Sequence, residues 1–200
     1  MRYTLGVFIV LFFLNCGTPP RKPGGDIIGN TPEKTEAPDQ KEIIVAPVTP
    51  DGAVSANFIS GEVPFYAYVK NVDTRRAITS VSFENTLLPD IQIPGSYGAT
   101  LSSLRFPELD RDVLLVNSRL KDPNFNKYYV YILRNNEWKQ MVNGFAIHKS
   151  NRPDTLSPIR IDPENPNNML RYYSVFDLDK SSGNKYTWRL LTESVPIKNR

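Results

Sequence analysis

The sequence of 200 residues has a single cysteine and a single histidine, and these two counts exclude most metal-binding and redox machinery. One cysteine can form neither an intramolecular disulfide nor the set of thiolates that holds structural zinc or an iron–sulfur cluster. One histidine leaves a multi-histidine metal centre without its ligands. We therefore expect no metal site and no cofactor.

The chain also lacks a large excess of charge of one sign. The chain has 24 basic and 21 acidic residues, a formal net charge of +3, and the two signs are mixed along it. Nucleic-acid binding requires a concentrated basic face, so no nucleic-acid partner is expected. The chain also has no Gly-x-Ser-x-Gly elbow, no P-loop and no dinucleotide-binding glycine fingerprint, and this favours a protein that is not an enzyme.

The chain has one long hydrophobic run, from Tyr3 to Leu14, which carries no charge and follows Arg2. A helix that crosses a bilayer needs about 20 apolar residues, so this run is too short for a permanent transmembrane anchor. A positive residue followed by a short apolar run is typical of a secretory signal peptide. We predict that residues 1–15 form this signal peptide.

The only cysteine, Cys16, comes directly after this run, where the chain reads Phe-Leu-Asn-Cys-Gly. This placement resembles the lipobox of bacterial lipoproteins in its relaxed, spirochaete-type form, with Asn15 where the general lipobox has a small residue. The resemblance covers residues 1–17 and implies cleavage after Asn15, diacylglycerol on the Cys16 sulfur and acylation of the new amino terminus. Two or three acyl chains hold a protein firmly to a membrane. The resemblance implies an outer-membrane lipoprotein, on either face of that membrane.

A tether is expected to follow, over residues 16–50. Its part from Gly17 to Pro50 has seven of the seventeen prolines, four of the eleven glycines and no aromatic residue. Such a composition buries too little apolar surface to fold and predicts a disordered linker. The apolar cluster from Ile43 to Val45 leaves a short strand open as an alternative.

The remaining residues, 51–200, predict a β domain. Eighteen of the 22 aromatic residues lie from Phe58 onward, in short β-type runs separated by turn residues. Residues 128–133 are apolar on both faces, which indicates a central strand, and Asn135-Asn136 indicates a tight hairpin. We predict an all-β domain, an antiparallel sandwich or small barrel of about ten short strands. The predicted strands cover residues 54–59, 63–70, 78–84, 90–93, 99–106, 113–120, 127–134, 137–142, 145–149, 158–162, 170–178 and 185–192.

Tyrosine and tryptophan are concentrated in the carboxy-terminal third of the chain. These side chains are enriched at interaction surfaces, because they bury a large area while a polar tip stays in water. The sequence thus favours a non-catalytic binding module for a protein or glycan partner, with the aromatic strands at 127–142 and 170–191 as its surface. The candidate surface residues are Tyr129, Tyr131, Trp138, Tyr172, Tyr173 and Trp188.

Two alternatives stay open. Glu108, Asp110 and Asp112 alternate along the chain, so on an extended segment they share one face, and a glycan or cell-wall hydrolase needs two carboxylates about 5–9.5 Å apart. A structural accessory subunit of an outer-membrane assembly would instead expose a large apolar patch. His148 alternates with apolar neighbours, and we expect a half-buried or surface strand histidine there.

Overall fold

The computed structural model describes residues 48–183 and 185–198. The predicted signal peptide, Cys16 and its lipids, the possible strand at 43–45 and the tether up to residue 47 lie outside the described residues and stay predictions. Within the described residues the protein has eleven β-strands, two short 3-10 helices and no α-helix, which confirms the all-β prediction. No helix in this part of the chain is long and apolar enough to cross a membrane.

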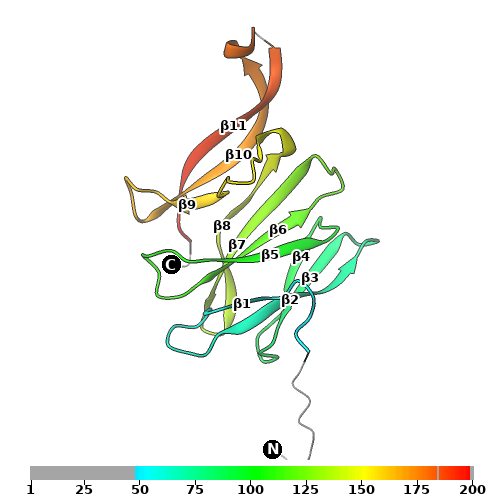
Figure 1. Ribbon diagram of the computed structural model, residues 1–200, viewed down its shortest axis with the longest axis vertical. Coiled ribbons are helices and arrows are strands. Elements are labelled where there is room, and N and C mark those ends of the chain that lie inside the picture. The colour runs from blue at the N-terminus through cyan, green and yellow to red at the C-terminus, as the bar shows by residue number, and fades with distance from the viewer. Residues whose placement is uncertain (1–47, 184, 199–200) are drawn as a thin grey trace, which may run out of the picture. The chain divides into compact units, whose positions relative to one another are not determined.

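The strands form three antiparallel sheets, each built from neighbouring strands of the chain (Figure 1). The first sheet has the order β1-β2-β3-β4, with bounds Val54–Ala56, Phe65–Asp73, Ile78–Phe83 and Ile91–Pro94. The second has the order β5-β6-β7-β8, with bounds Ala99–Leu104, Val113–Arg119, Phe125–Arg134 and Glu137–His148. The third has the order β11-β10-β9, in which the bounds of β9, β10 and β11 are Ile159–Ile161, Asn168–Asp179 and Lys185–Pro196.

The strand β8 joins two strands that the sequence predicts as separate, 137–142 and 145–149. On its partner β7, Tyr128 pairs with Phe145 and Val130 pairs with Val142, so two residues of β8 lie opposite one residue of β7. This is a β-bulge. Asn143 and Gly144 have the composition of a turn, but here they form the bulge and the strand continues.

The hairpin between β7 and β8 turns at Asn135 and Asn136, as the sequence predicts. Both residues have positive φ angles, 52° and 60°. Two consecutive residues in this region make a type I′ turn, whose twist matches that of the flanking strands. Asparagine tolerates this backbone conformation better than most other residues with a side chain.

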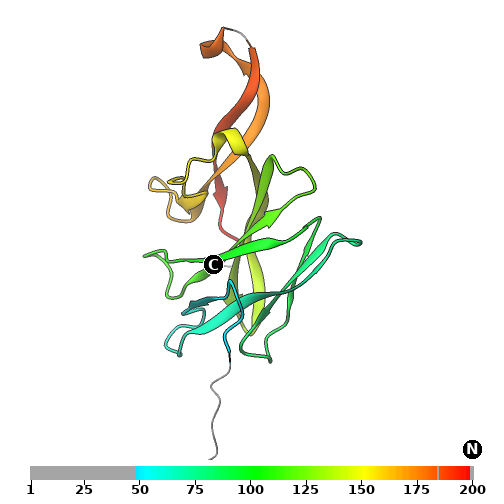
Figure 2. The same ribbon diagram turned by 45° about the vertical axis from the view of Figure 1, so that its right-hand side comes forward.

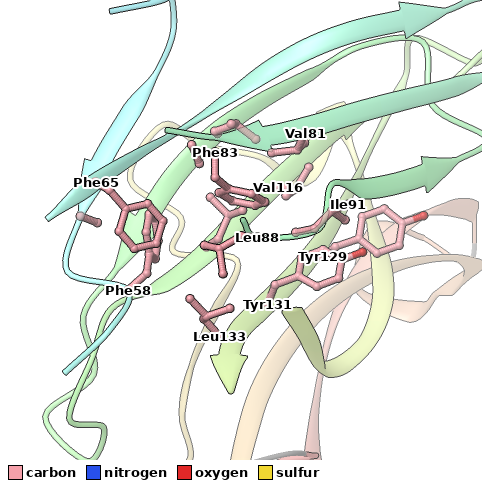
Figure 3. Packing of buried hydrophobic residues seen from close by; sticks show 14 of the residues in the cluster. Phe58, Phe65, Val81, Phe83, Leu88, Ile91, Val116, Tyr129, Tyr131 and Leu133 are labelled. Carbon is pink, nitrogen blue, oxygen red and sulfur yellow. The ribbon is translucent and has the colours of Figure 1, made fainter. Parts of the chain in front are cut away.

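The second sheet is the central layer, because apolar side chains cover both of its faces. On β7, Tyr129, Tyr131 and Leu133 point into an inner core against the first sheet (Figure 3), and the alternating Tyr128 and Val130 point into an outer core. The outer core also contains Ile159 and Met169 of the third sheet. This arrangement confirms a β-sandwich with β7 as a central strand, extended by a third sheet on the outer face.

The hairpin formed by β10 and β11 lies along the free edge of β8, where the views in Figures 1 and 2 agree. Hydrogen bonds from the hairpin and from Lys198, which follows it, attach this part of the chain to that edge. The His148 backbone N–H donates to Ser174 Oγ at 2.9 Å, Arg171 Nη1 donates to the Asn143 carbonyl at 3.0 Å, and the Lys198 N–H donates to the Met141 carbonyl at 2.7 Å. The distal part of this hairpin, beyond the stretch of β10 that pairs with β9, carries the candidate site.

Candidate functional site

Two of the six aromatic residues predicted for a binding surface lie in the core instead, and a third is half-buried against it. Tyr129 and Tyr131 are only 7% and 9% exposed, and their rings stack 6.4 Å apart between the first and second sheets (Figure 3). Burial raises the pKa of Tyr131 to about 12. Trp138 packs against the same core, with its ring stacked 4.5 Å from Phe83. A surface position is therefore wrong for Tyr129 and Tyr131, because both faces of the central sheet are covered, and Trp138 offers a partner only part of its surface.

Tyr172 and Tyr173 are less buried than Tyr129 and Tyr131 but are not fully exposed. Both are half-buried and pack against the outer core. The Arg171 guanidinium lies over the Tyr173 ring, 6.0 Å from its centre. These two tyrosines fix the hairpin to the central sheet and offer a partner only part of their surface.

Trp188 is the sixth predicted residue, and it belongs to a continuous set of five rings that we call the aromatic row. The Trp188 ring stacks on the His148 ring at 4.9 Å, and the Phe125 ring meets Trp188 edge-on, also at 4.9 Å. Trp188 also lies 5.2 Å from Phe176, which lies 5.8 Å from Tyr186. Phe176 and Tyr186 are 59% and 65% exposed, so the row runs from half-buried rings into solvent.

The strand registers explain why these rings meet. Phe176 lies directly opposite Trp188 in the third sheet, and Phe125 lies directly opposite His148 in the second. Side chains that face each other across an antiparallel pair lie on the same side of the sheet. The row therefore consists of two cross-strand pairs, one from each sheet, brought together where the hairpin lies along β8, and extended by Tyr186.

Asn151 holds the two pairs together. This residue ends the 3-10 helix Lys149–Asn151, which follows β8 directly. Its Nδ2 donates to the Trp188 carbonyl at 3.0 Å and to Ser174 Oγ at 3.1 Å. The half-buried end of the row is thus fixed to both sheets by hydrogen bonds as well as by ring packing.

His148 has a structural place in this site. Its ring is half-buried against Trp188, and its Nδ1 forms a hydrogen bond with Ser150 Oγ at 2.8 Å. This agrees with the half-buried strand histidine that the sequence predicts. No group of three histidine, cysteine, aspartate or glutamate side chains in the described part of the chain could hold a metal ion.

The three carboxylates considered for catalysis do not share a face, because their segment is a turn and not an extended strand. The Leu109 N–H closes this turn on the Phe106 carbonyl at 3.0 Å. Asp110 accepts two hydrogen bonds from Arg111, at 2.9 Å each, and these hold the pKa of the Asp110 carboxyl well below its usual range. The arrangement expected on an extended segment is therefore wrong.

The other two carboxylates of this segment have separate environments. Asp112 accepts a hydrogen bond from the Asn57 backbone N–H at 2.8 Å and lies 3.5 Å from the Arg105 guanidinium. Glu108 is exposed to solvent. Asp110 and Asp112 therefore act in the structure as partners of arginines and of the backbone.

The predicted surface segment 170–191 includes Phe176 and Tyr186, but neither residue is among the six candidates. Phe125 lies outside the predicted segments, and His148 was considered only by itself, so the grouping was not predicted. The register of the β10–β11 hairpin is the signal that finds the grouping, since it places Phe176 opposite Trp188. Comparison with known proteins gives no match to a protein family, to a curated protein or to a solved structure.

Proposed function

We propose that this protein is an outer-membrane lipoprotein, attached through lipids on Cys16, whose β domain is a non-catalytic module that binds a protein or glycan partner at the aromatic row. The observation that carries the proposal is the pair of adjacent exposed rings, Phe176 and Tyr186. Monomeric proteins rarely leave large apolar side chains together in solvent unless the surface serves an interaction. The lipid anchor rests on the sequence around Cys16.

The exposed rings are suited to binding because they are held in place before a partner arrives. Trp188 packs against Phe176, and His148 and Phe125 in turn pack against Trp188. A preorganised ring loses little conformational freedom when it is covered. Burial of apolar area then contributes about 25 cal/mol per Å².

Two libraries of probes test the binding surface on the detergent-solubilised full chain. Random dodecapeptides displayed on phage represent protein partners, and a glycan array represents sugars. The double variant Phe176→Ser/Tyr186→Ser removes the exposed rings. We expect ligands selected with the natural chain to bind this variant at least about tenfold more weakly, as for aromatic hot spots.

The first sheet offers a matched control. Tyr66 and Tyr68 are another pair of neighbouring rings, half-buried and 5.9 Å apart on β2, far along the chain from the row. The variant Tyr66→Ser/Tyr68→Ser should bind the selected ligands as the natural chain does. Equal losses in both double variants, or no ligand whose binding depends on Phe176 and Tyr186, would contradict the proposed surface.

The anchor is tested independently of the ligand. Replacement of Cys16 by alanine should release the protein from the membrane fraction and abolish metabolic labelling with radioactive fatty acid, because the acyl chains supply most of the membrane affinity. Replacement of Ser55, an exposed hydroxyl residue of β1, by alanine is the control and should leave both unchanged. Labelling that survives Cys16→Ala would exclude this residue as the lipid attachment site.

A further inference from the structure

The strand β11 forms one edge of the third sheet and is one of the longest strands in the protein, with twelve residues. Among residues 48–183 and 185–198, only β10 pairs with it. An edge strand carries a row of backbone N–H and C=O groups that point away from the sheet. Whether those groups have partners decides whether the edge can accept another strand.

The hydrogen bonds to β9 show which residues of β11 point outward. The Tyr172 N–H donates to the Pro158 carbonyl at 3.1 Å, and the Asn168 carbonyl accepts from the Asp162 N–H at 3.0 Å, so the even-numbered residues of β10 face β9. Successive residues of a strand alternate in direction, so the odd-numbered residues of β10 face β11.

The same alternation continues into β11. Arg171 and Tyr173 of β10 lie opposite Glu193 and Leu191, so the odd-numbered residues of β11 bond to β10 and its even-numbered residues point outward. The hydrogen bond from Asn151 to the outward Trp188 carbonyl agrees with this assignment.

The long edge strand of the central sheet gives the contrast. Along β8 the third sheet and Lys198, which follows it, supply partners to Met141, Asn143 and His148 through the hydrogen bonds described above. Along β11, no described residue bonds to the outward backbone groups of Leu190, Thr192 or Ser194. The β10–β11 register has no bulge, and the only proline of β11 is its last residue, so two of the devices that usually protect an edge are missing here. The charged residues of β11, Lys185, Arg189 and Glu193, are all odd-numbered.

The open edge at Leu190, Thr192 and Ser194 continues the strand that carries Tyr186 and Trp188 of the aromatic row. Tyr186 and Trp188, which belong to the row, are even-numbered and alternate with the residues that bond to β10, and the side chains of Leu190 and Thr192 continue the same face. None of these four side chains carries a charge. A chain that paired with the edge would therefore also place side chains against the row.

We propose that the partner of the aromatic row is an extended polypeptide segment that adds to β11 as a further strand. This rests on the proposed function and names the class of the partner. Unpaired N–H and C=O groups that recur every second residue, about 6.8 Å apart, match the repeat of another extended backbone. The segment has uncharged, mostly apolar side chains at alternate positions and no proline where it bonds to β11.

The packing of Trp188 favours a polypeptide over a glycan. A sugar that stacks on tryptophan needs a free ring face, but His148 lies parallel to the indole at 17°, and Phe176 lies 5.2 Å from it on the row. Only the tilted pair Phe176 and Tyr186 extends into solvent. Apolar side chains of a peptide can pack around such a pair without a flat platform.

The experiment uses dodecapeptides from the random library whose binding depends on Phe176 and Tyr186. The variant Thr192→Pro removes one outward N–H and places a ring at the edge, while the bonds from β11 to β10 come from the odd-numbered residues and are kept. Binding of these peptides should weaken by about tenfold or more. The control Thr192→Val keeps the N–H and should bind as the natural chain does.

N-methylation of the peptide gives a second measurement that leaves the protein unchanged. Methylation of alternate peptide nitrogens should weaken binding at every second position only, because only alternate residues of an edge strand face its neighbour. This pattern shows whether the peptide binds by strand addition even if Thr192→Pro fails to fold.

The failures of the two proposals can be told apart. Ring-dependent peptides that tolerate N-methylation at all positions, or ring-dependent binding of glycans without any peptide, would overturn strand addition and leave the proposed binding surface intact. Selected peptides that match the sequence of β11, together with dimerisation of the chain itself, would identify a second copy as the partner. That result would overturn the proposal of a segment from another protein. Absence of any ring-dependent ligand would overturn both proposals.

Discussion

The same three-residue sequence occurs near the start of two strands that have opposite environments in this protein. Asn-Lys-Tyr occurs at residues 126–128, in β7, and again at 184–186, where β11 begins. Tyr128 is 9% exposed and stacks on Phe145 at 5.6 Å inside the outer core. Tyr186 is 65% exposed and, among the described residues, its ring contacts that of Phe176.

The difference comes from the number of layers and not from the local sequence. The second sheet has a sheet on each face, so every side chain of β7 between Tyr128 and Leu133 is buried. The distal part of the β10–β11 hairpin has two strands only, since β9 pairs with Met169–Arg171 and no further. A two-stranded ribbon cannot bury both of its faces, so its aromatic side chains stay available to a partner.

The largest expected effect of this difference is on the free energy of unfolding. Ile132 of β7 is fully buried in the outer core. Ile132→Ala should destabilise the protein by about 2–5 kcal/mol, the range for a large-to-small change in a packed core. Guanidinium denaturation checks this value, and a loss below about 1 kcal/mol would show that the central layer is not tightly packed.

The next largest expected effect is on the free energy of unfolding at alkaline pH, and it comes from the buried phenol of Tyr131. Its pKa is about 12 in the folded protein, against 10 for an unperturbed tyrosine, because burial disfavours the phenolate. The unfolded chain therefore loses this proton first as the pH rises from 10 to 12, and the folded state loses up to roughly 2–3 kcal/mol of stability. Below pH 10 this contribution does not change with pH.

The variant Tyr131→Phe isolates that contribution, since it keeps the ring and removes the proton. Its stability should fall less steeply than that of the natural chain between pH 10 and 12, as measured by denaturation at each pH. Tyr186→Phe, at an exposed ring, is the control and should follow the natural chain. Parallel curves for the natural chain and Tyr131→Phe would mean that the Tyr131 hydroxyl is solvated.

The β7–β8 turn shows how far local backbone conformation, as opposed to packing between sheets, contributes to stability. Asn136 has a φ angle of 60°, which costs an L-residue with a Cβ about 1–2 kcal/mol unless it is asparagine or aspartate. Asn136→Ala should therefore destabilise by about 1 kcal/mol, whereas Asn136→Gly should be neutral or stabilising. Thermal denaturation of the two variants gives the comparison, and equal melting temperatures would exclude backbone strain at this position.

The fold was predictable because it depends on patterns that are local in the sequence. Each strand of the structure overlaps a predicted one, since short alternating runs and turn residues mark them directly. One boundary was predicted wrongly: the sequence placed a break at Asn143 and Gly144, where the structure has the single strand β8. The ideal Cβ position on Gly144 lies 2.8 Å from the Tyr129 ring, so that glycine is required by a contact across the sheet and not by a turn.

The candidate site was only partly predictable, because exposure depends on how the sheets pack. Alternation placed Tyr129 and Tyr131 on one face of β7, but nothing in the local sequence shows that the first sheet covers this face. The meeting of His148 with Trp188 likewise depends on the position of the hairpin along β8. Of the predicted surface residues, Trp188 alone belongs to the row.

The smallest expected effect on stability belongs to the exposed rings. Phe176→Ser and Tyr186→Ser each remove a side chain that is mostly in solvent, so each should change the free energy of unfolding by less than about 0.5 kcal/mol. Guanidinium denaturation checks both variants. A loss as large as that of Ile132→Ala would place these rings in the core.

The central claim, that the central layer holds the fold while the exposed rings bind, is tested most directly on the double variant Phe176→Ser/Tyr186→Ser by measuring its affinity for a selected peptide and its free energy of unfolding in the same buffer. The account predicts at least about a tenfold loss of affinity together with a loss of less than about 1 kcal/mol in stability. Unchanged affinity, or a loss of affinity that follows from unfolding, would contradict it.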